Sequence, residues 1–393
     1  MDRSALRRAF LLMFTALAGV ACTSLLGDFE LDDGAGTSAA GGGGNDGSGG
    51  AQCETTCDIG KADCVDCNGD CETTITNDRE NCGACGKSCE GGDCVQGVCQ
   101  PVLVATDDSK AEGIAVDANS IYWTDNGAPS GSGSGAIMKS PILVPDPPPA
   151  PTELISNQES PLYLSVRGDY IYWTVRSVGN VRVAAKTGGD VAVFHIGGAP
   201  AGIVTDDTHA YWTSDSNAQF GVYRKPLQAG TAETLVQGEV GAYGIALDHN
   251  NVYWVTRGDA AMATGTVKQM PKAGGTIITI AEMQAGPRSV AVDGTHVYWT
   301  NEITRTVLRT PIGGNDAPQP IFDGQLDGLA PRDIAIDASG VYWTDASTGG
   351  IYRYDRPRGP VTKLASSSPS QTLALDPKRI YWTTLAGVYK LVK

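Results

Sequence analysis

Tyr122-Trp123-Thr124-Asp125 is the first of seven stretches in which a tyrosine directly precedes a tryptophan. These stretches contain all seven tryptophans of the 393-residue chain: Trp123, Trp173, Trp212, Trp254, Trp299, Trp343 and Trp382. Successive tryptophans are separated by 50, 39, 42, 45, 44 and 39 residues. A period of about 40 to 45 residues is typical of the blades of a β-propeller. The spacing therefore predicts a β-propeller over residues 101–393.

Each repeat unit can be divided into four strands. A short apolar segment such as Ile114-Ala115-Val116 leads through a turn into the Tyr-Trp segment, and two further strands follow, the first of them exemplified by Ile351-Tyr352-Arg353. β-Branched and aromatic residues dominate these segments, and no useful helical periodicity is present. The composition agrees, because 50 glycines, 21 prolines and only 19% charged residues favour turn-rich β structure. We therefore expect an all-β protein.

The two ends of the repeat region predict how the ring closes. The last unit stops at Lys393 after its third strand, whereas Val102-Leu103-Val104 precedes the first unit and belongs to no unit of its own. If this segment supplies the fourth strand of the last unit, no blade keeps an open edge. This closure predicts seven blades.

The N-terminus carries features of export and membrane attachment. Three arginines among the first eight residues precede the apolar run 9–21, which is too short to span a bilayer and leads directly into Cys22. The segment resembles a bacterial lipoprotein signal, which implies removal of residues 1–21 and lipidation of Cys22, although Gly19 replaces the leucine that this pattern prefers. An ordinary secretory signal is the alternative. Because Thr23 is not an aspartate, the resemblance implies the outer membrane or cell surface; without lipidation the protein would be secreted or periplasmic.

Residues 22–52 are expected to form a flexible, disordered tether. They contain the run Gly41–Gly44 and three further glycines within residues 47–50, several acids and few large apolar side chains, so they cannot bury enough surface to fold. The whole chain has a net charge of −15, which becomes −17 without residues 1–21, since these carry three arginines and one aspartate. Such an acidic protein is a poor partner for nucleic acid, whose phosphates require a basic surface.

Ten further cysteines lie within residues 53–100. They are Cys53, Cys57, Cys64, Cys67, Cys71, Cys82, Cys85, Cys89, Cys94 and Cys99. Their number is even and the signal directs export, so we expect five disulfides in a small module. Two Cys-x-x-Cys pairs could instead hold zinc through four thiolates, but the compartment favours disulfides. The stretch looks like the cysteine-rich modules of secreted proteins from some Gram-negative soil bacteria.

Two of the repeats carry a fuller motif. Tyr122-Trp123-Thr124-Asp125 and Tyr342-Trp343-Thr344-Asp345 resemble the YWTD repeat of low-density-lipoprotein-receptor class B propellers, and the other five units retain Tyr-Trp. That family is typically six-bladed and binds proteins, so the resemblance implies a binding role and makes six blades the alternative to seven. The aromatic pairs themselves are expected to pack between neighbouring blades rather than to contact a ligand.

The sequence contains no recognisable catalytic constellation. His209, His249 and His296 lie in the turn before the Tyr-Trp strand, where other units have asparagine or serine, and His195 lies in a fourth strand. An aspartate at a turn, five residues before the tyrosine, recurs in six units, as a structural cap would; unit two has Arg167 instead. These aspartates are Asp117, Asp206, Asp248, Asp293, Asp337 and Asp376. We therefore expect no enzymatic activity, no metal site and no cofactor; no EF-hand or other motif supports calcium.

The loops that enter the first strands should line one mouth of the central channel. They present Glu112, Tyr163, Ala201, Tyr243, Arg288, Arg332 and Gln371. Two arginines, two tyrosines and a glutamine against one carboxylate suit an anion or a peptide better than a divalent cation. A metal-dependent lactonase- or lyase-like propeller enzyme is the alternative, but such a site needs three or four carboxylates or amides that converge on the axis.

The loops after the tryptophans emerge on the same face and are longest in units one and four. We expect a shallow pocket between these loops, although loops that are merely solvated and variable are the alternative. Its predicted residues are Tyr163, Tyr243, Arg288 and Arg332, with Asp125, Asn301 and Asp345 nearby. Aromatic area and guanidinium groups of this kind anchor protein or glycan partners. The sequence thus predicts a monomeric, lipid-anchored envelope scaffold that binds an envelope or extracellular protein, peptide or glycan.

Overall fold

The computed structural model describes residues 58–64, 73–106, 111–127, 134–143, 150–216, 219–259, 262–314, 316–325 and 327–393. The predictions for the signal peptide, Cys22, the tether and four of the cysteines (Cys53, Cys57, Cys67 and Cys71) lie outside the described residues. Within the described residues the secondary structure is 32 strands and one 3-10 helix, η1 (Arg176–Val178). No helix in these ranges is long and apolar enough to cross a membrane. The predicted all-β class is confirmed.

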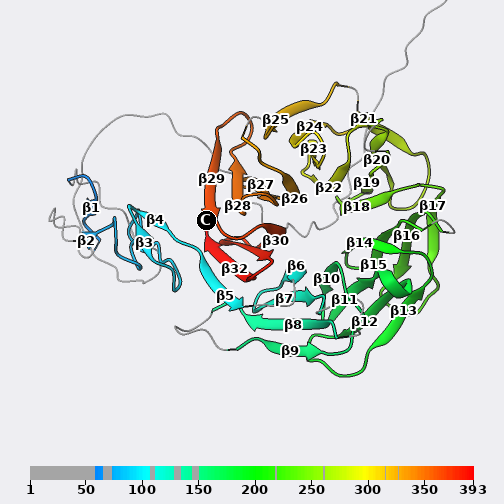
Figure 1. The fold of residues 1–393 in the computed structure, drawn as a ribbon, viewed down its shortest axis with the longest axis horizontal. Coiled ribbons are helices and arrows are strands. Elements are labelled where there is room, and N and C mark those ends of the chain that lie inside the picture. The colour runs from blue at the N-terminus through cyan, green and yellow to red at the C-terminus, as the bar shows by residue number, and fades with distance from the viewer. Residues whose placement is uncertain are drawn as a thin grey trace, which may run out of the picture. The chain divides into compact units, whose positions relative to one another are not determined.

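Seven antiparallel sheets of four strands each form the blades of a β-propeller (Figure 1). In six of them the four strands follow one another along the chain from the inner strand to the outer strand. The inner strands are β6 (Ala111–Val116), β10 (Leu164–Arg167), β14 (Pro200–Thr205), β18 (Ala242–Leu247), β22 (Pro287–Val292), β26 (Pro331–Asp337) and β30 (Ser370–Leu375). The second strands, which carry Tyr-Trp, are β7 (Ser120–Asp125), β11 (Tyr170–Val175), β15 (His209–Ser214), β19 (Asn251–Thr256), β23 (His296–Asn301), β27 (Gly340–Asp345) and β31 (Arg379–Thr384).

The third and outer strands complete each blade. The third strands are β8 (Ala136–Pro141), β12 (Asn180–Ala185), β16 (Gly221–Pro226), β20 (Gly265–Pro271), β24 (Thr306–Pro311), β28 (Gly350–Tyr354) and β32 (Gly387–Val392). The outer strands are β9 (Thr152–Ile155), β13 (Ala192–Ile196), β17 (Glu233–Gln237), β21 (Ile278–Gln284), β25 (Gln319–Asp323), β29 (Val361–Ser366) and, for blade seven, β5 (Val102–Thr106).

Blade seven is closed by both ends of the propeller. The N-terminal strand β5 pairs antiparallel with β32, so that Leu103 lies opposite Tyr389 and Val102 opposite Lys390. The inner strand β30 of the same blade packs against β6 of blade one. The predicted closure and the count of seven blades are therefore confirmed, and the six-bladed alternative is wrong because the seventh unit forms a complete sheet.

The Tyr-Trp pairs hold neighbouring blades together. All seven tryptophans are fully buried. Each of the seven apolar clusters of the propeller contains the tryptophan of one blade and the tyrosine of the blade before it, as Trp173 and Tyr122 show. In three blades a tyrosine of the third strand also stacks on the tryptophan; Tyr352 and Trp343 lie 5.8 Å apart at 9°. The predicted packing role of these pairs follows directly from these clusters.

The six recurring aspartates cap the turns between the first and second strands. In blade one, Asp117 accepts hydrogen bonds from the backbone N–H groups of Asn119 and Ser120, both at 2.9 Å. The other five aspartates accept the two equivalent N–H groups. Asp117 also accepts the Tyr122 hydroxyl at 3.2 Å and the ammonium of Lys186, from the next blade, at 2.6 Å. These carboxylates are therefore engaged in structural bonds.

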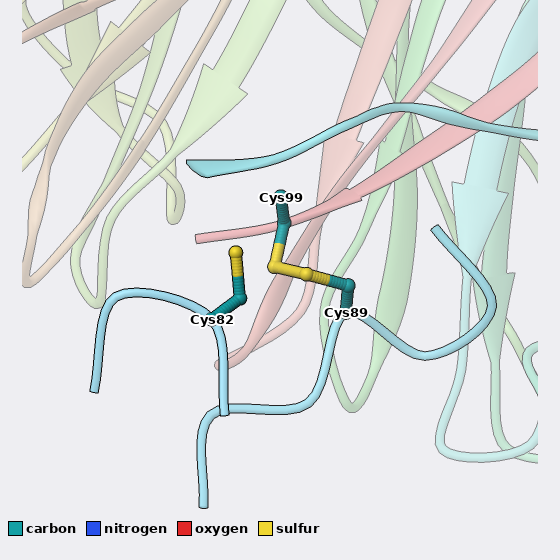
Figure 2. Close-up of side chains that lie close together, drawn as sticks. All are labelled: Cys82, Cys89 and Cys99. Atoms are coloured by element: carbon teal, nitrogen blue, oxygen red, sulfur yellow. A yellow bond between two sulfur atoms is a disulfide. The ribbon is translucent and has the colours of Figure 1, made fainter. Parts of the chain in front are cut away.

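The six described cysteines of the cysteine-rich segment form three disulfides. Its short strands are β1 (Lys61–Ala62), β2 (Thr73–Thr74), β3 (Cys94–Val95) and β4 (Val98–Cys99). The described cysteines pair as Cys64–Cys85, Cys82–Cys94 and Cys89–Cys99. The sulfur atoms of Cys82, Cys89 and Cys99 lie within 4.8 Å of one another (Figure 2), but all three are oxidised and offer no thiolate to zinc.

Candidate functional site

A β-bulge at the start of the inner strands shapes one end of the central channel. In blade one, Ala111 lies opposite Asp125 and Ile114 opposite Trp123, so the two residues between them, Glu112 and Gly113, face only Thr124. The same irregularity occurs in blades three to seven. A bulge redirects side chains away from the regular strand pattern. Of the seven predicted mouth residues, Arg288 and Gln371 lie on such bulges and line the channel cavity, and Tyr163 lines it from blade two, which has no bulge.

In five blades the threonine after the tryptophan fixes this bulge. In blade one the Thr124 hydroxyl accepts the N–H of Gly113 and donates to the carbonyl of Leu162 in blade two, both at 2.8 Å. Four more threonines bond to their own bulge and to the next blade in the same manner: Thr213, Thr300, Thr344 and Thr383. Blade four has Val255 at this position, and its side chain has no hydroxyl that could donate to the backbone carbonyl of Arg288 in blade five.

Three of the predicted binding residues lie together. The hydroxyl oxygens of Tyr163 and Tyr243 are 3.4 Å apart, and their rings meet edge to face with centroids 5.9 Å apart. The guanidinium of Arg288 lies over the Tyr243 ring, 5.2 Å from its centroid. The fourth residue, Arg332, lies 3.7 Å from Glu112 at another part of the rim. The structure thus brings together Tyr163, Tyr243 and Arg288 but not Arg332, and the role of these residues in binding stays a prediction.

Tyr163 occupies a different register from the other mouth residues. Leu164 lies opposite Trp173, so Tyr163 matches the second bulge position and Leu162 matches Glu112 and Arg288. Blades three and four have Gly202 and Gly244 at this second position. Because neither glycine has a side chain at this position, the Tyr163 ring of blade two extends past blade three and contacts Tyr243 of blade four.

The channel contains a cavity of about 190 Å³. Tyr163, Arg288, Ser289, Asp333 and Gln371 supply its polar part. The remainder includes a ring of aliphatic residues, one per blade, each opposite a tryptophan: Ile114, Leu164, Ile203, Ile245, Val290, Ile334 and Leu373. A few polar groups on an apolar wall are common in ligand sites, and the volume of this cavity suits a single small group rather than a whole drug-sized ligand.

Arg288 is the most unusual charged residue of this cavity. It is only 8% exposed, yet among the described residues it has a single hydrogen-bond partner, Glu302, at 3.5 Å. A guanidinium has five N–H donors. Although burial works in the opposite direction, the neighbouring Tyr163, Tyr243 and Glu302 raise the pKa of Arg288, so it remains charged. Most of its donors are therefore free to meet an anionic group.

Asp333 lies beside Arg288 on the adjacent inner strand. Its carboxylate accepts the Ser289 hydroxyl at 2.7 Å and the N–H of Leu373 at 2.9 Å, and so connects blades five, six and seven. Burial raises the pKa of Asp333, and these two hydrogen bonds partly oppose that rise. Sequence reasoning missed Asp333 and Ser289 because it took one mouth residue from each strand, whereas a bulge presents two.

The three residues predicted near the pocket cap loops. Asp125 accepts the N–H of Gly127 at 2.7 Å, and Asn301 donates to Gln284 at 2.9 Å. Asp345 accepts the N–H groups of Ala330 and Ser347 at 2.7 and 3.0 Å. None of these three side chains lines the channel cavity described here, and their participation in binding stays a prediction.

No protein-family profile matches the sequence, and no curated protein resembles it significantly. Virginiamycin B lyase from Staphylococcus aureus is similar in structure, with a TM-score of 0.60, 13% identity, and coverage of 75% of this chain and 98% of that chain. A catalytically inactive histidine-to-alanine variant of that lyase with quinupristin has a TM-score of 0.59 and 15% identity, and the match covers 75% of this chain and 98% of that chain. A chain from a nidogen–laminin complex has a TM-score of 0.47 and 16% identity, and the match covers 59% of this chain and 90% of that chain. At these identities the likeness shows the propeller fold alone.

These comparisons correct the expectation that the protein is not an enzyme. That expectation rested on the lack of a recognisable motif, but solved propellers similar to this one include lyases. The lack of a motif therefore excludes no activity, and the fold by itself establishes none. The lyase variant indicates that a histidine matters in that enzyme. Among the described residues that line this channel cavity there is no histidine, so that residue's role cannot be transferred.

Proposed function

We propose that this protein binds an anionic group of its ligand at the mouth of the central channel, through Arg288 with Tyr163 and Tyr243. The observation that carries the proposal is the buried guanidinium of Arg288, which uses one long hydrogen bond to Glu302 within the described part of the chain. Its other donors are not closed off within the protein, because Arg288 lines the channel cavity, where a ligand can accept their hydrogen bonds. An anionic ligand would supply that acceptor.

The charges around the mouth support an anion. Arg257, Arg288 and Arg332 face two carboxylates, Glu112 and Glu302, in ion pairs of 2.7 to 3.7 Å. The three guanidinium groups thus exceed these two carboxylates by one; the third acid of the mouth, Asp333, has a pKa that burial raises, which favours its neutral form. The sequence predicts a scaffold that binds a protein, a peptide or a glycan. We add that this ligand carries an anionic group where it meets Arg288.

Replacement of Arg288 by glutamine tests the proposal. We expect the purified full chain to bind acetate or inorganic phosphate in isothermal titration calorimetry, and Arg288→Gln to weaken this binding at least tenfold because the fixed charge is lost. Arg358→Gln, at an exposed arginine of blade six, is the matched control and should bind like the wild type. Equal binding by the wild type and Arg288→Gln would refute the proposal.

Lyase activity at the same cavity is the second candidate. Its support is the likeness in fold to two solved lyases together with the buried carboxyl of Asp333 beside Arg288, since burial raises the pKa of this carboxyl and a positioned carboxyl can transfer a proton. Incubation with quinupristin and mass spectrometry of the product would test it. A product made equally well by Arg288→Gln would place any such reaction elsewhere.

Attachment to the outer membrane through Cys22 is a separate proposal. It is supported by the lipoprotein-like signal, and the acidic, glycine-rich residues 22–52 would provide a tether. Cys22→Ala should release the protein from the membrane fraction and remove a lipid-sized mass, both measured on protein from the exporting host. Unchanged membrane retention without a lipid-sized mass difference would rule lipidation out.

A further inference from the structure

A second cavity lies beside the channel mouth, over blade four. Its volume is about 550 Å³, and it is lined by the loops after the second strands of blades three to five and by the loops that enter the inner strands of blades four and five. This volume falls within the range of about 300 to 1,000 Å³ that is usual for small-molecule sites. The cavity is thus large enough for a ligand with several non-polar groups.

Two exposed aliphatic side chains lie among the polar residues that line this outer cavity, which include Asp215, Arg257, Asp259 and Glu302. Val240, from the loop that enters β18, is 61% exposed, and Ile303, just after β23, is 53% exposed. Exposed aliphatic side chains that face one cavity mark a binding site more often than scattered ones do. They indicate that the group held here is apolar.

Two glycines provide part of the lining between these side chains. Gly258 has φ +61°, and a Cβ at this position would collide with the backbone of Gly265. Gly286 has φ +67°, and a Cβ there would lie 2.9 Å from Ile303. The positive φ angles and the neighbouring chain therefore require glycine at both positions, and both contribute backbone to the lining.

The outer cavity and the channel share one wall. Arg257 and Glu302 line the outer cavity, and Arg288 lines the channel. Glu302 accepts hydrogen bonds from Arg257 at 2.7 Å and from Arg288 at 3.5 Å. Both guanidinium groups lie against the Tyr243 ring, 5.1 and 5.2 Å from its centroid. A group bound to Arg288 would therefore lie next to the outer cavity, which begins at the Glu302 carboxylate.

We infer that the ligand is the free carboxyl terminus of a peptide whose last residues are apolar. The carboxylate binds Arg288 at the channel mouth, and the apolar side chains lie between Val240 and Ile303. This inference rests on the proposed function, since it uses the same arginine, and adds the chemical class of the ligand. Capture of a C-terminal carboxylate together with apolar side chains is a recurring mode of peptide recognition.

Three peptides separate the two parts of the inference: acetyl-Ala-Leu-Leu with a free carboxylate, its C-terminal amide, and acetyl-Ala-Ser-Ser with a free carboxylate. We expect the full chain to bind the first at least tenfold more tightly than either of the others in isothermal titration calorimetry. The double variant Val240→Ser, Ile303→Ser should lose about tenfold in affinity for the leucyl acid and bind acetate like the wild type. Val193→Ser, at an exposed valine of blade two, is the matched control.

Two results would overturn the inference. Equal affinity for the leucyl acid and its amide would show that no carboxylate is recognised, and unchanged affinity in the double variant would show that the outer cavity is not used. Failure of the proposed function would look different, because Arg288→Gln would then bind acetate like the wild type. Thermal unfolding followed by circular dichroism shows whether each variant is folded.

Discussion

The N–H groups of the buried tryptophans depend on a residue fifteen positions earlier in the chain. Gln158 accepts the hydrogen bond of Trp173 at 3.2 Å, and Gln284 accepts that of Trp299 at 3.0 Å. Glu239 accepts the hydrogen bond of Trp254 in blade four, and Ser367 accepts that of Trp382 in blade seven. Blades three and six have glycine at this position, and the indole nitrogens of Trp212 and Trp343 have no partner among the described residues.

Gln284→Ala should therefore destabilise the protein. Its side-chain oxygen also accepts the amide of Asn301 at 2.9 Å, so the substitution leaves two buried donors without a partner. We expect the free energy of unfolding in urea to fall by about 1 to 3 kcal/mol. Gln319→Ala, at an exposed position of β25, should change it by less than about 0.5 kcal/mol. Equal effects of the two substitutions would contradict this account.

The residues of the candidate site were only partly predictable. The repeat places Arg288 and Tyr243 at the channel mouth because equivalent positions of equal units must lie at equivalent places. Tyr163 is one register position further along because blade two pairs Leu164 with Trp173, and strand pairing is not visible in a single sequence. Glu302 was missed because its role depends on Arg257 and Arg288, which belong to blades four and five.

At the scale of the element, the capped turn is the unit that recurs most regularly. Asp293 accepts the N–H groups of Thr295 and His296, both at 2.7 Å, the Tyr298 hydroxyl at 3.1 Å, and the guanidinium of Arg356 from blade six. Although burial opposes the shift, these hydrogen bonds lower the pKa of Asp293 to about 2. The sequence predicted this cap from the position of the aspartate alone, because an aspartate at the start of a turn bonds to N–H groups two and three residues later.

The lowered pKa of Asp293 predicts a loss of stability in acid. Because the pKa is lower in the folded than in the unfolded state, the unfolded chain takes up the proton first, and stability falls as the pH drops from about 4 towards 2. Asp293→Asn should reduce the free energy of unfolding at pH 7 and weaken its dependence on pH below 4, as measured in urea. The exposed Asp190→Asn is the control. An unchanged pH profile in Asp293→Asn would exclude this carboxylate as the cause.

At the scale of the whole molecule, one short strand joins the first and last parts of the propeller. The sequence predicted this closure because the missing strand of unit seven and the unassigned segment before unit one are both visible in the repeat. The disulfide pairing could not be predicted in the same way, since ten cysteines allow many pairings and their spacing does not choose among them. Cys82 pairs with Cys94 rather than within its Cys-x-x-Cys pair with Cys85.

The closing strand should control the stability of the entire ring. Val104 of β5 is fully buried, in an apolar cluster that contains Trp123 of blade one and Tyr381 of blade seven. Val104→Asp places an unpaired charge in this cluster, so we expect a lower melting temperature in circular dichroism and faster proteolysis of the propeller. Val98→Asp, at a valine that is 55% exposed in β4, carries the same change of charge and should melt like the wild type. If both variants melt together, β5 contributes little, and the ring must be held by the contact between β30 and β6 alone.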